Sequence, residues 1–144
     1  MRIAYLECFS GISGDMLLGA LADAGAPAAD LAALPEKLGL RGVSLSLAKA
    51  RRSQINATQA RVEAAETADY HRSLASIEQM ITRSSLPERA RNNAIAVFRR
   101  LGEVEAGIHG IAVEQVHFHE VGAADSIMDI VGACAGLELL GVEK

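Results

Sequence analysis

The hydrophobic and polar positions of the first forty residues predict one strand followed by two helices. Residues 2–9 read as a strand that ends in a Ser/Gly loop. A helix is expected from about Ser13, because apolar residues recur at helical spacing until Gly25, a typical stop signal. A second helix is expected over about 28–38, ending at Gly39.

The next segment changes to a period of two. Val43, Leu45 and Leu47 alternate with serines, and residues 60–64 alternate again, so two half-buried antiparallel strands are predicted. The chain would turn, or its strands would end, around 51–56.

The second half of the sequence is mainly helical. Ser73 can cap a helix that carries Leu74, Ile77, Met80 and Ile81. Ser85 to Glu88 fits a capping box that opens a long helix ending at Gly110. The apolar stripe predicted to pack along its whole length consists of Ala90, Ala94, Val97, Leu101, Val104 and Ile108.

A short extended segment within 113–121 and a last helix over about 123–140 complete the chain. Strands and helices follow one another without regular βα alternation, so the predicted class is α+β. We expect a small, mostly antiparallel sheet packed by several helices, one of them long. The 144 residues suit a single domain.

Composition narrows the class of protein further. Half of the residues are hydrophobic, only 3% are aromatic, and the formal net charge is −4, which disfavours nucleic acid as a partner. Cys8 and Cys134 lack metal-type spacing and indicate reduced thiols in a cytoplasmic protein. No apolar run approaches the length of a membrane span.

The first candidate site is the loop that joins the expected strand to the first helix. Its glycines would let the backbone approach a ligand, and Asp15 would suit a cation better than a phosphate. The alternative is a tight turn in which Ser13 caps the helix and Asp15 favours its dipole. The candidate binding residues are Ser10, Gly11, Ser13, Gly14 and Asp15.

The second candidate is the string His117-Phe118-His119-Glu120. In an extended segment, residues two apart point to the same side, so both imidazoles would face one metal while Phe118 enters the core. Imidazole suits nickel, zinc, copper and iron. The alternative is a pair of half-exposed histidines on an edge strand.

The third candidate is the pair Asp125 and Asp129, which share one face of the last helix. A solvated face is one explanation. Gly132 and Gly136 lie on that same face, however, and each glycine costs roughly 0.8–1 kcal/mol relative to alanine in a helix. They make sense if another element or a ligand approaches closely.

Other polar residues allow two interpretations each. His71 suits a surface or capping role, or a third metal ligand, and His109 suits a helix C-terminus. Lys49, Arg51 and Arg52 form either a solvated turn or a phosphate site.

Four stretches together resemble a known family. They are AYLECFSGISGDM at 4–16, YHRSLASIEQMI at 70–81, AGIHG at 106–110 and VHFHEVGAADSIMDIVG at 116–132. In this order they resemble the N-terminal region of the nickel insertion proteins of lactate racemase cofactor synthesis, the LarC family.

The resemblance implies a CTP-dependent nickel chelatase of the lyase class. Family members place nickel in a pyridinium bis-thiocarboxylate mononucleotide, with a nickel–carbon bond and nickel–sulfur bonds. They are considerably longer, and CTP with its divalent metal belongs to their C-terminal region. The chain is thus expected to be an N-terminal part with incomplete activity alone. Its expected partners are that C-terminal region, the mononucleotide, the lactate racemase apoprotein and further copies of itself.

The motif matches carry over to particular residues. His117, His119 and His71 are expected to hold nickel, while Glu120, Asp125 and Asp129 complete the shell or remove a ring proton. Asp15, His71, His117, His119 and Asp125 should line one cleft. Two rival functions use the same features differently: a metal-dependent phosphoester hydrolase, and an assembly domain whose long helix forms an oligomer.

Overall fold

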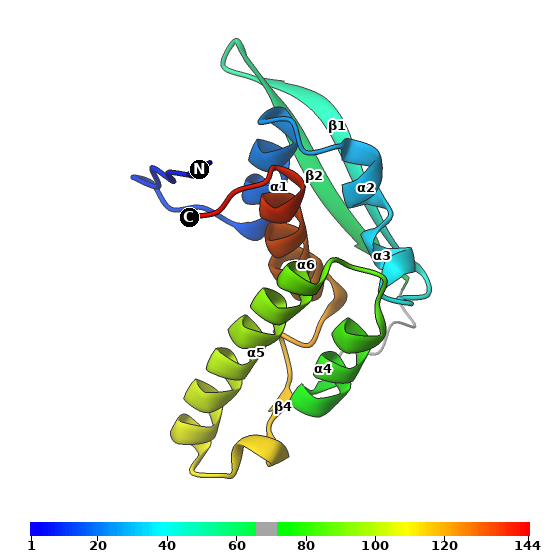
Figure 1. Ribbon diagram of the computed structural model, residues 1–144, viewed down its shortest axis with the longest axis vertical. Helices are drawn as coiled ribbons and strands as arrows, with labels where there is room; N and C mark the ends of the chain where they lie inside the picture. The colour runs from blue at the N-terminus through cyan, green and yellow to red at the C-terminus, as the bar shows by residue number, and fades with distance from the viewer. Residues whose placement is uncertain (66–71) are drawn as a thin grey trace.

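The computed structural model describes residues 1–65 and 72–144 (Figure 1). The described elements are α1 (Gly14–Asp23), α2 (Ala28–Ala32), α3 (Leu34–Lys37), β1 (Val43–Arg52), β2 (Ile55–Ala64), β3 (Arg72–Ser73), α4 (Leu74–Arg83), α5 (Glu88–His109), the 3₁₀ helix η1 (Val113–Gln115), β4 (His117–Phe118) and α6 (Ala124–Leu139). Figure 1 shows α6 between two groups of elements: α1 to α3 with the β1–β2 hairpin, and α4 with α5 and β4. The predicted α+β class is confirmed.

The strands of the β1–β2 hairpin are longer than the alternating residues 43–47 and 60–64 predicted. The strands pair antiparallel from Val43 opposite Ala64 to Arg52 opposite Ile55. The turn is therefore only two residues, Ser53 and Gln54, and both have positive φ angles of 47° and 71°. Two such residues match the right-handed twist of a hairpin and let pairing continue to the turn.

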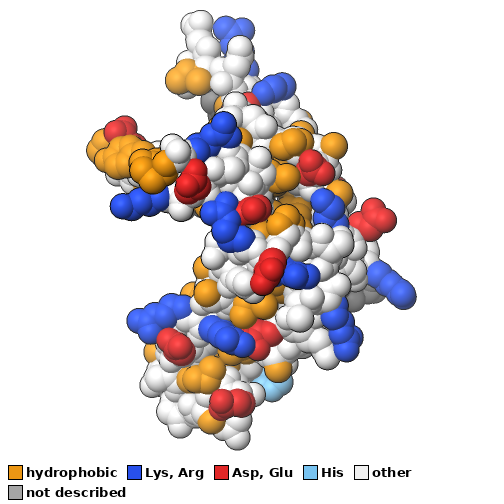
Figure 2. All heavy atoms as spheres, viewed as in Figure 1, with side chains coloured by type: hydrophobic (Ala, Val, Ile, Leu, Met, Phe, Trp, Pro, Cys, Tyr) orange, Lys and Arg blue, Asp and Glu red, His pale blue; other side chains and the backbone are white. Residues whose placement is uncertain are grey.

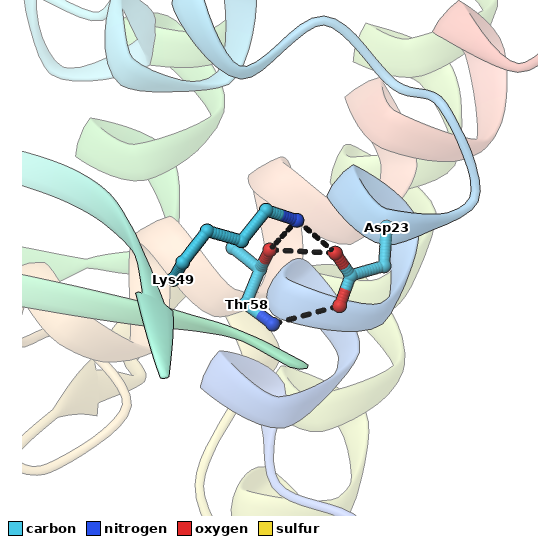
Figure 3. Close-up of polar contacts among 3 residues, drawn as sticks. All are labelled: Asp23, Lys49 and Thr58. Atoms are coloured by element: carbon cyan, nitrogen blue, oxygen red, sulfur yellow. Dashed lines mark hydrogen bonds and ion pairs between the residues drawn. The ribbon is translucent and has the colours of Figure 1, made fainter. Parts of the chain in front are cut away.

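Helix α1 lies directly on β2. A Cβ atom at Gly19 would overlap the carbonyl oxygen of Thr58, so the helix can only approach the strand this closely at a glycine. The contact is locked at the end of α1 by Asp23 (Figure 3). Its carboxylate accepts hydrogen bonds from the Lys49 Nζ at 2.7 Å, the Thr58 backbone nitrogen at 2.7 Å and the Thr58 Oγ1 at 2.6 Å. Bonds from Lys49 first, and then from Thr58, lower the pKa of Asp23 to about 2.

Helix α1 also packs against α6 through small residues. A Cβ atom at Gly132 would lie 2.5 Å from the Leu18 Cδ2, and one at Gly136 would lie 2.8 Å from the Leu21 Cδ1. Both leucines are buried. The expectation that another element approaches this glycine face is therefore confirmed: the element is α1.

The core around α4, α5 and β4 is centred on two phenylalanines. Phe98 and Phe118 are both buried, and their ring centroids lie 6.2 Å apart at 56°. Gly102 makes room for Leu74 beside this pair, because a Cβ atom there would lie 2.9 Å from the Leu74 Cδ2. Ser73 caps α4 as predicted, accepting a hydrogen bond from the Ser76 backbone nitrogen at 3.1 Å.

The predicted stripe of α5 is only partly correct. The buried positions advance in steps of four through Ala90, Ala94, Phe98, Gly102 and Ala106. A step of four residues rotates the stripe slowly around the helix. After Ala94 the buried positions therefore differ from the predicted stripe, and Val97, Val104 and Ile108 are exposed.

Three local predictions differ from the structure. The expected helix over 28–38 is divided into α2 and α3, although it ends at Gly39 as predicted. The capping box does not form, because α5 begins at Glu88 and Pro87, not Ser85, occupies its N-cap position. Residues 2–9 form no strand: among the described residues their backbone pairs with no sheet, and it makes single hydrogen bonds to 143–144 and to Gly11.

No described helix has the length and hydropathy needed to cross a membrane. Both cysteines are free thiols: Cys8 is exposed and Cys134 is partly buried.

Candidate functional site

The loop before α1 ends in an exposed polar turn. Gly11 has a φ of +82°, and its nitrogen donates to the carbonyl of Cys8 at 3.1 Å. Ser13 occupies the N-cap position, but its side chain makes no capping bond; its hydroxyl donates to the carboxylate of Asp15. Ser13 thus holds the predicted cap position without the capping hydrogen bond, and Asp15 lies in the first turn as expected. Ser10, at the start of this loop, is exposed.

Helix α6 brings two more carboxylates to this turn. A Cβ atom at Gly14 would overlap the Asp129 side chain, so only glycine permits this contact. Burial first, and then the negative charges of Asp15 and Asp125, raise the pKa of Asp129 to about 6. Asp129 is half-buried under α1, whereas Asp125 is exposed and accepts from the Ser126 backbone nitrogen at 2.8 Å. We call Asp15, Asp125 and Asp129 the carboxylate cluster.

The histidine pair lies on β4 and just after it. Strand β4 pairs with β3, with Phe118 opposite Arg72 and His117 opposite Ser73. Phe118 is buried, while His117 and His119 are exposed. The predicted alternation is confirmed: Phe118 anchors the segment in the core, and the histidines stay at the surface.

A short turn joins the histidine pair to the carboxylate cluster. The Ala123 nitrogen donates to the carbonyl of Glu120 at 3.0 Å, and the Ser126 hydroxyl contacts the same carbonyl at 3.3 Å. The Arg72 guanidinium donates to the carbonyl of Gly122 at 2.6 Å and ties β3 to this turn. No sequence pattern indicates this role for Arg72, because 50 residues separate it from Gly122 along the chain. The Glu120 side chain is exposed.

The structure brings only part of the predicted site together. Within residues 1–65 and 72–144, no three His, Cys, Asp or Glu side chains are grouped closely enough to hold a metal ion. His71 lies outside the described residues, so its expected role stays a prediction. The same holds for the binding of nickel by His117 and His119.

A shallow groove of about 450 Å³ runs from the carboxylate cluster along the hairpin. It is lined by Asp15, Met16, Ala50 and residues 57–60. A second hollow shares Ala50 and is lined by Lys49, Arg51 and Asn56. The second hollow therefore carries the positive side chains Lys49 and Arg51, and Ala50 links it to the groove that Asp15 lines. Sequence reasoning singled out the cations but missed the groove, because nothing in strand alternation indicates where α1 crosses β2.

The described domain thus combines an α+β fold with three neighbouring carboxylates on α1 and α6 and an exposed histidine pair at β4. The family model described as nickel insertion protein matches residues 4–144. The chain belongs to this family.

Curated relatives agree with the family match. A "Putative nickel insertion protein" of Thermomicrobium roseum is 51% identical over all of this chain and 36% of its own length. A "Pyridinium-3,5-bisthiocarboxylic acid mononucleotide nickel insertion protein" of Desulfitobacterium hafniense (strain DSM 10664 / DCB-2) is 49% identical, again over the whole chain and 36% of its own length. The chain thus spans little more than a third of these relatives. No solved structure matches it.

Proposed function

We propose that this chain is the nickel- and substrate-binding N-terminal part of a cytoplasmic, CTP-dependent nickel chelatase. The whole protein would insert nickel into pyridinium-3,5-bisthiocarboxylic acid mononucleotide, the molecule in the name of the Desulfitobacterium relative. The observation that carries the proposal is the carboxylate cluster. Asp15 comes from one family motif and Asp129 from another, and the contact at Gly14 brings them together.

The cluster suits a metal that is held and then released. The combined negative charge of the three carboxylates attracts a divalent cation to this end of the domain, and its approach would reduce their mutual repulsion. His117 and His119 would supply imidazole nitrogens from the adjoining segment, with Glu120 beside them. Thiocarboxylate sulfur is a softer donor than carboxylate or imidazole, so nickel passes to the substrate's sulfurs.

The nickel–carbon bond requires removal of a ring proton. Asp129 fits the base, because a carboxylate with a pKa of about 6 is ionised at neutral pH yet basic enough to accept a proton. The ring C–H bond breaks, its proton goes to the carboxylate, and its electron pair forms the bond to nickel. Asp125 and Glu120 remain the alternative bases.

The groove along the hairpin offers room for the mononucleotide. If the metal-binding end of the mononucleotide lies at Asp15, its phosphate would lie towards Lys49 and Arg51. Arg51 is exposed, whereas Lys49 is held by Asp23 at 2.7 Å. Arg51 is therefore the better phosphate anchor.

CTP and its divalent metal would bind outside this chain, in the C-terminal region that the resemblance implies. The isolated chain should then bind substrate and nickel without turning over CTP. Lactate racemase would receive the finished cofactor. The oligomer would be an assembly of copies of the whole protein.

The experiment is native mass spectrometry of the chain with Ni²⁺ and the mononucleotide. A complex of chain, nickel and mononucleotide is expected. Asp15→Asn with Asp129→Asn should lower nickel occupancy at least ten-fold, and Arg51→Ala should lower only mononucleotide occupancy. Glu103→Gln, an exposed carboxylate on α5, is the matched control. Undiminished nickel occupancy without the two carboxylates, or release of phosphate from the mononucleotide, would contradict the proposal.

A further inference from the structure

Many large apolar side chains of the first sixteen residues are exposed. Phe9 is 92% exposed, Tyr5 83% and Ile3 57%, and Leu6 and Met16 are also exposed. Figure 2 shows hydrophobic side chains gathered on the projecting segment that Figure 1 marks as the N-terminus. A cluster of this kind on a protein surface marks an interaction site.

Residues 2–9 have the sequence pattern of a β-strand, yet they pair with no sheet in the described part of the chain. Ile3, Tyr5 and Phe9 occupy alternate positions that face one side of an extended chain, and Ala4 and Leu6 face the other. Apolar residues on both sides are typical of a strand buried within a sheet. Among the described residues, no backbone hydrogen bond reaches the stretch from 5 to 7.

The last residues of the chain run beside this segment. The Ala4 nitrogen donates to the carbonyl of Lys144 at 2.9 Å, and the Glu143 nitrogen donates to the carbonyl of Arg2 at 2.8 Å. The Arg2 guanidinium also donates to the carbonyl of Leu140. Polypeptide that follows residue 144 would therefore start next to the uncovered strand.

The relatives are long enough to contain a segment that covers residues 2–9. The chain matches 36% of each of the two relatives described above, so most of their polypeptide lies outside the match. A segment tethered at residue 144 has a high effective concentration at 2–9, which favours it over a second copy that must diffuse there.

We propose that residues 2–9 are a β-strand added to a sheet of the polypeptide that follows residue 144 in the longer proteins of this family. This rests on the proposal that the chain is their N-terminal part. Strand addition would satisfy the unpaired backbone groups and bury Tyr5 and Phe9. Because Ser10 to Asp15 follow directly, the same docking would fix the loop that carries Asp15, and the downstream region would thereby order the nickel site.

Hydrogen exchange tests this in a chimera. The 144 residues replace the matched 36% of the Thermomicrobium roseum relative, and exchange is followed by mass spectrometry in the chimera and in the isolated chain. The amides of residues 3–9 should exchange at least ten-fold more slowly in the chimera. Tyr5→Asp with Phe9→Asp should restore fast exchange. Ile108→Asp, a matched control on the exposed side of α5, should leave the protection unchanged.

Two results would overturn the proposal. One is equal exchange of residues 3–9 in the chimera and the isolated chain. The other is protection in the isolated chain that rises with its concentration and accompanies a dimer in sedimentation, because a second copy would then be the occupant. If the chimera fails to fold, the unmodified relative and its own matched N-terminal part give the same comparison. Neither result depends on nickel binding, so failure here leaves the proposed function standing.

Discussion

Replacing Asp129 with asparagine is expected to stabilise the domain at neutral pH. The pKa of Asp129 rises from 3.8 to about 6, chiefly because α1 buries it and then because Asp15 and Asp125 repel its charge. A shift of about 2 pH units corresponds to about 3 kcal/mol. The side chain is only half-buried, so solvent screening reduces this to roughly 1 kcal/mol. Asparagine keeps the shape and removes the charge.

The pH dependence fixes the sign of the effect. Below about pH 4 the carboxyl of Asp129 is protonated in both the folded and the unfolded chain, so wild type and variant should be equally stable. Between about 4 and 6 the unfolded carboxyl ionises freely while the folded one resists, and the wild type loses stability. Above about 6 the difference is complete.

Thermal unfolding at pH 4.0 and 7.5 measures this directly. Asp129→Asn should raise the Tm by roughly 3 °C at pH 7.5 and by nothing resolvable at pH 4.0. Glu114→Gln, an exposed carboxylate on η1, should leave the Tm unchanged at both pH values. An equal gain at both pH values would show that charge repulsion in the cluster is not the cause.

Three further changes test the packing around the site. Gly132→Ala should lower stability by about 1–3 kcal/mol because its Cβ would press on Leu18, whereas Gly107→Ala, which meets nothing within 4 Å, should raise it by about 0.8–1 kcal/mol; urea titration compares them. Phe118→Ala should cost about 3–5 kcal/mol by the same titration, since the ring is buried against Phe98. Asp23→Asn should lower the Tm at pH 7 but change it little near pH 2, where the wild-type carboxylate also loses its charge. Equal Tm losses for Asp23→Asn at both pH values would contradict the hydrogen-bonded carboxylate.

Local periodicity predicted the elements correctly where an element packs on its neighbours in sequence. The hairpin, α1, α4 and the end of α5 at Gly110 follow from alternation, helical spacing and stop signals. It failed where distant contacts decide. Residues 2–9 have the pattern of a strand but no sheet in the described chain, and the buried stripe of α5 is set by Phe98 and Gly102.

The candidate site shows the same division. Spacing alone predicted that Phe118 is buried between two exposed histidines. The glycines of α6 also predicted a close neighbour, but only the structure identifies that neighbour as α1 and the contact as Gly14 against Asp129. The raised pKa of Asp129 depends on that contact, so no pattern within α6 could indicate it.

Nickel titration by calorimetry tests the central claim most directly, with wild type compared with His117→Ala/His119→Ala at pH 7.5 and 5.5. Imidazole binds the metal only in its neutral form, so protons compete with nickel and wild-type affinity should fall at the lower pH. The double variant should lose most of its affinity at pH 7.5 and remain folded, because both side chains are exposed. His109→Ala, an exposed histidine at the end of α5, should bind as wild type. Undiminished nickel affinity in the folded double variant would contradict the account.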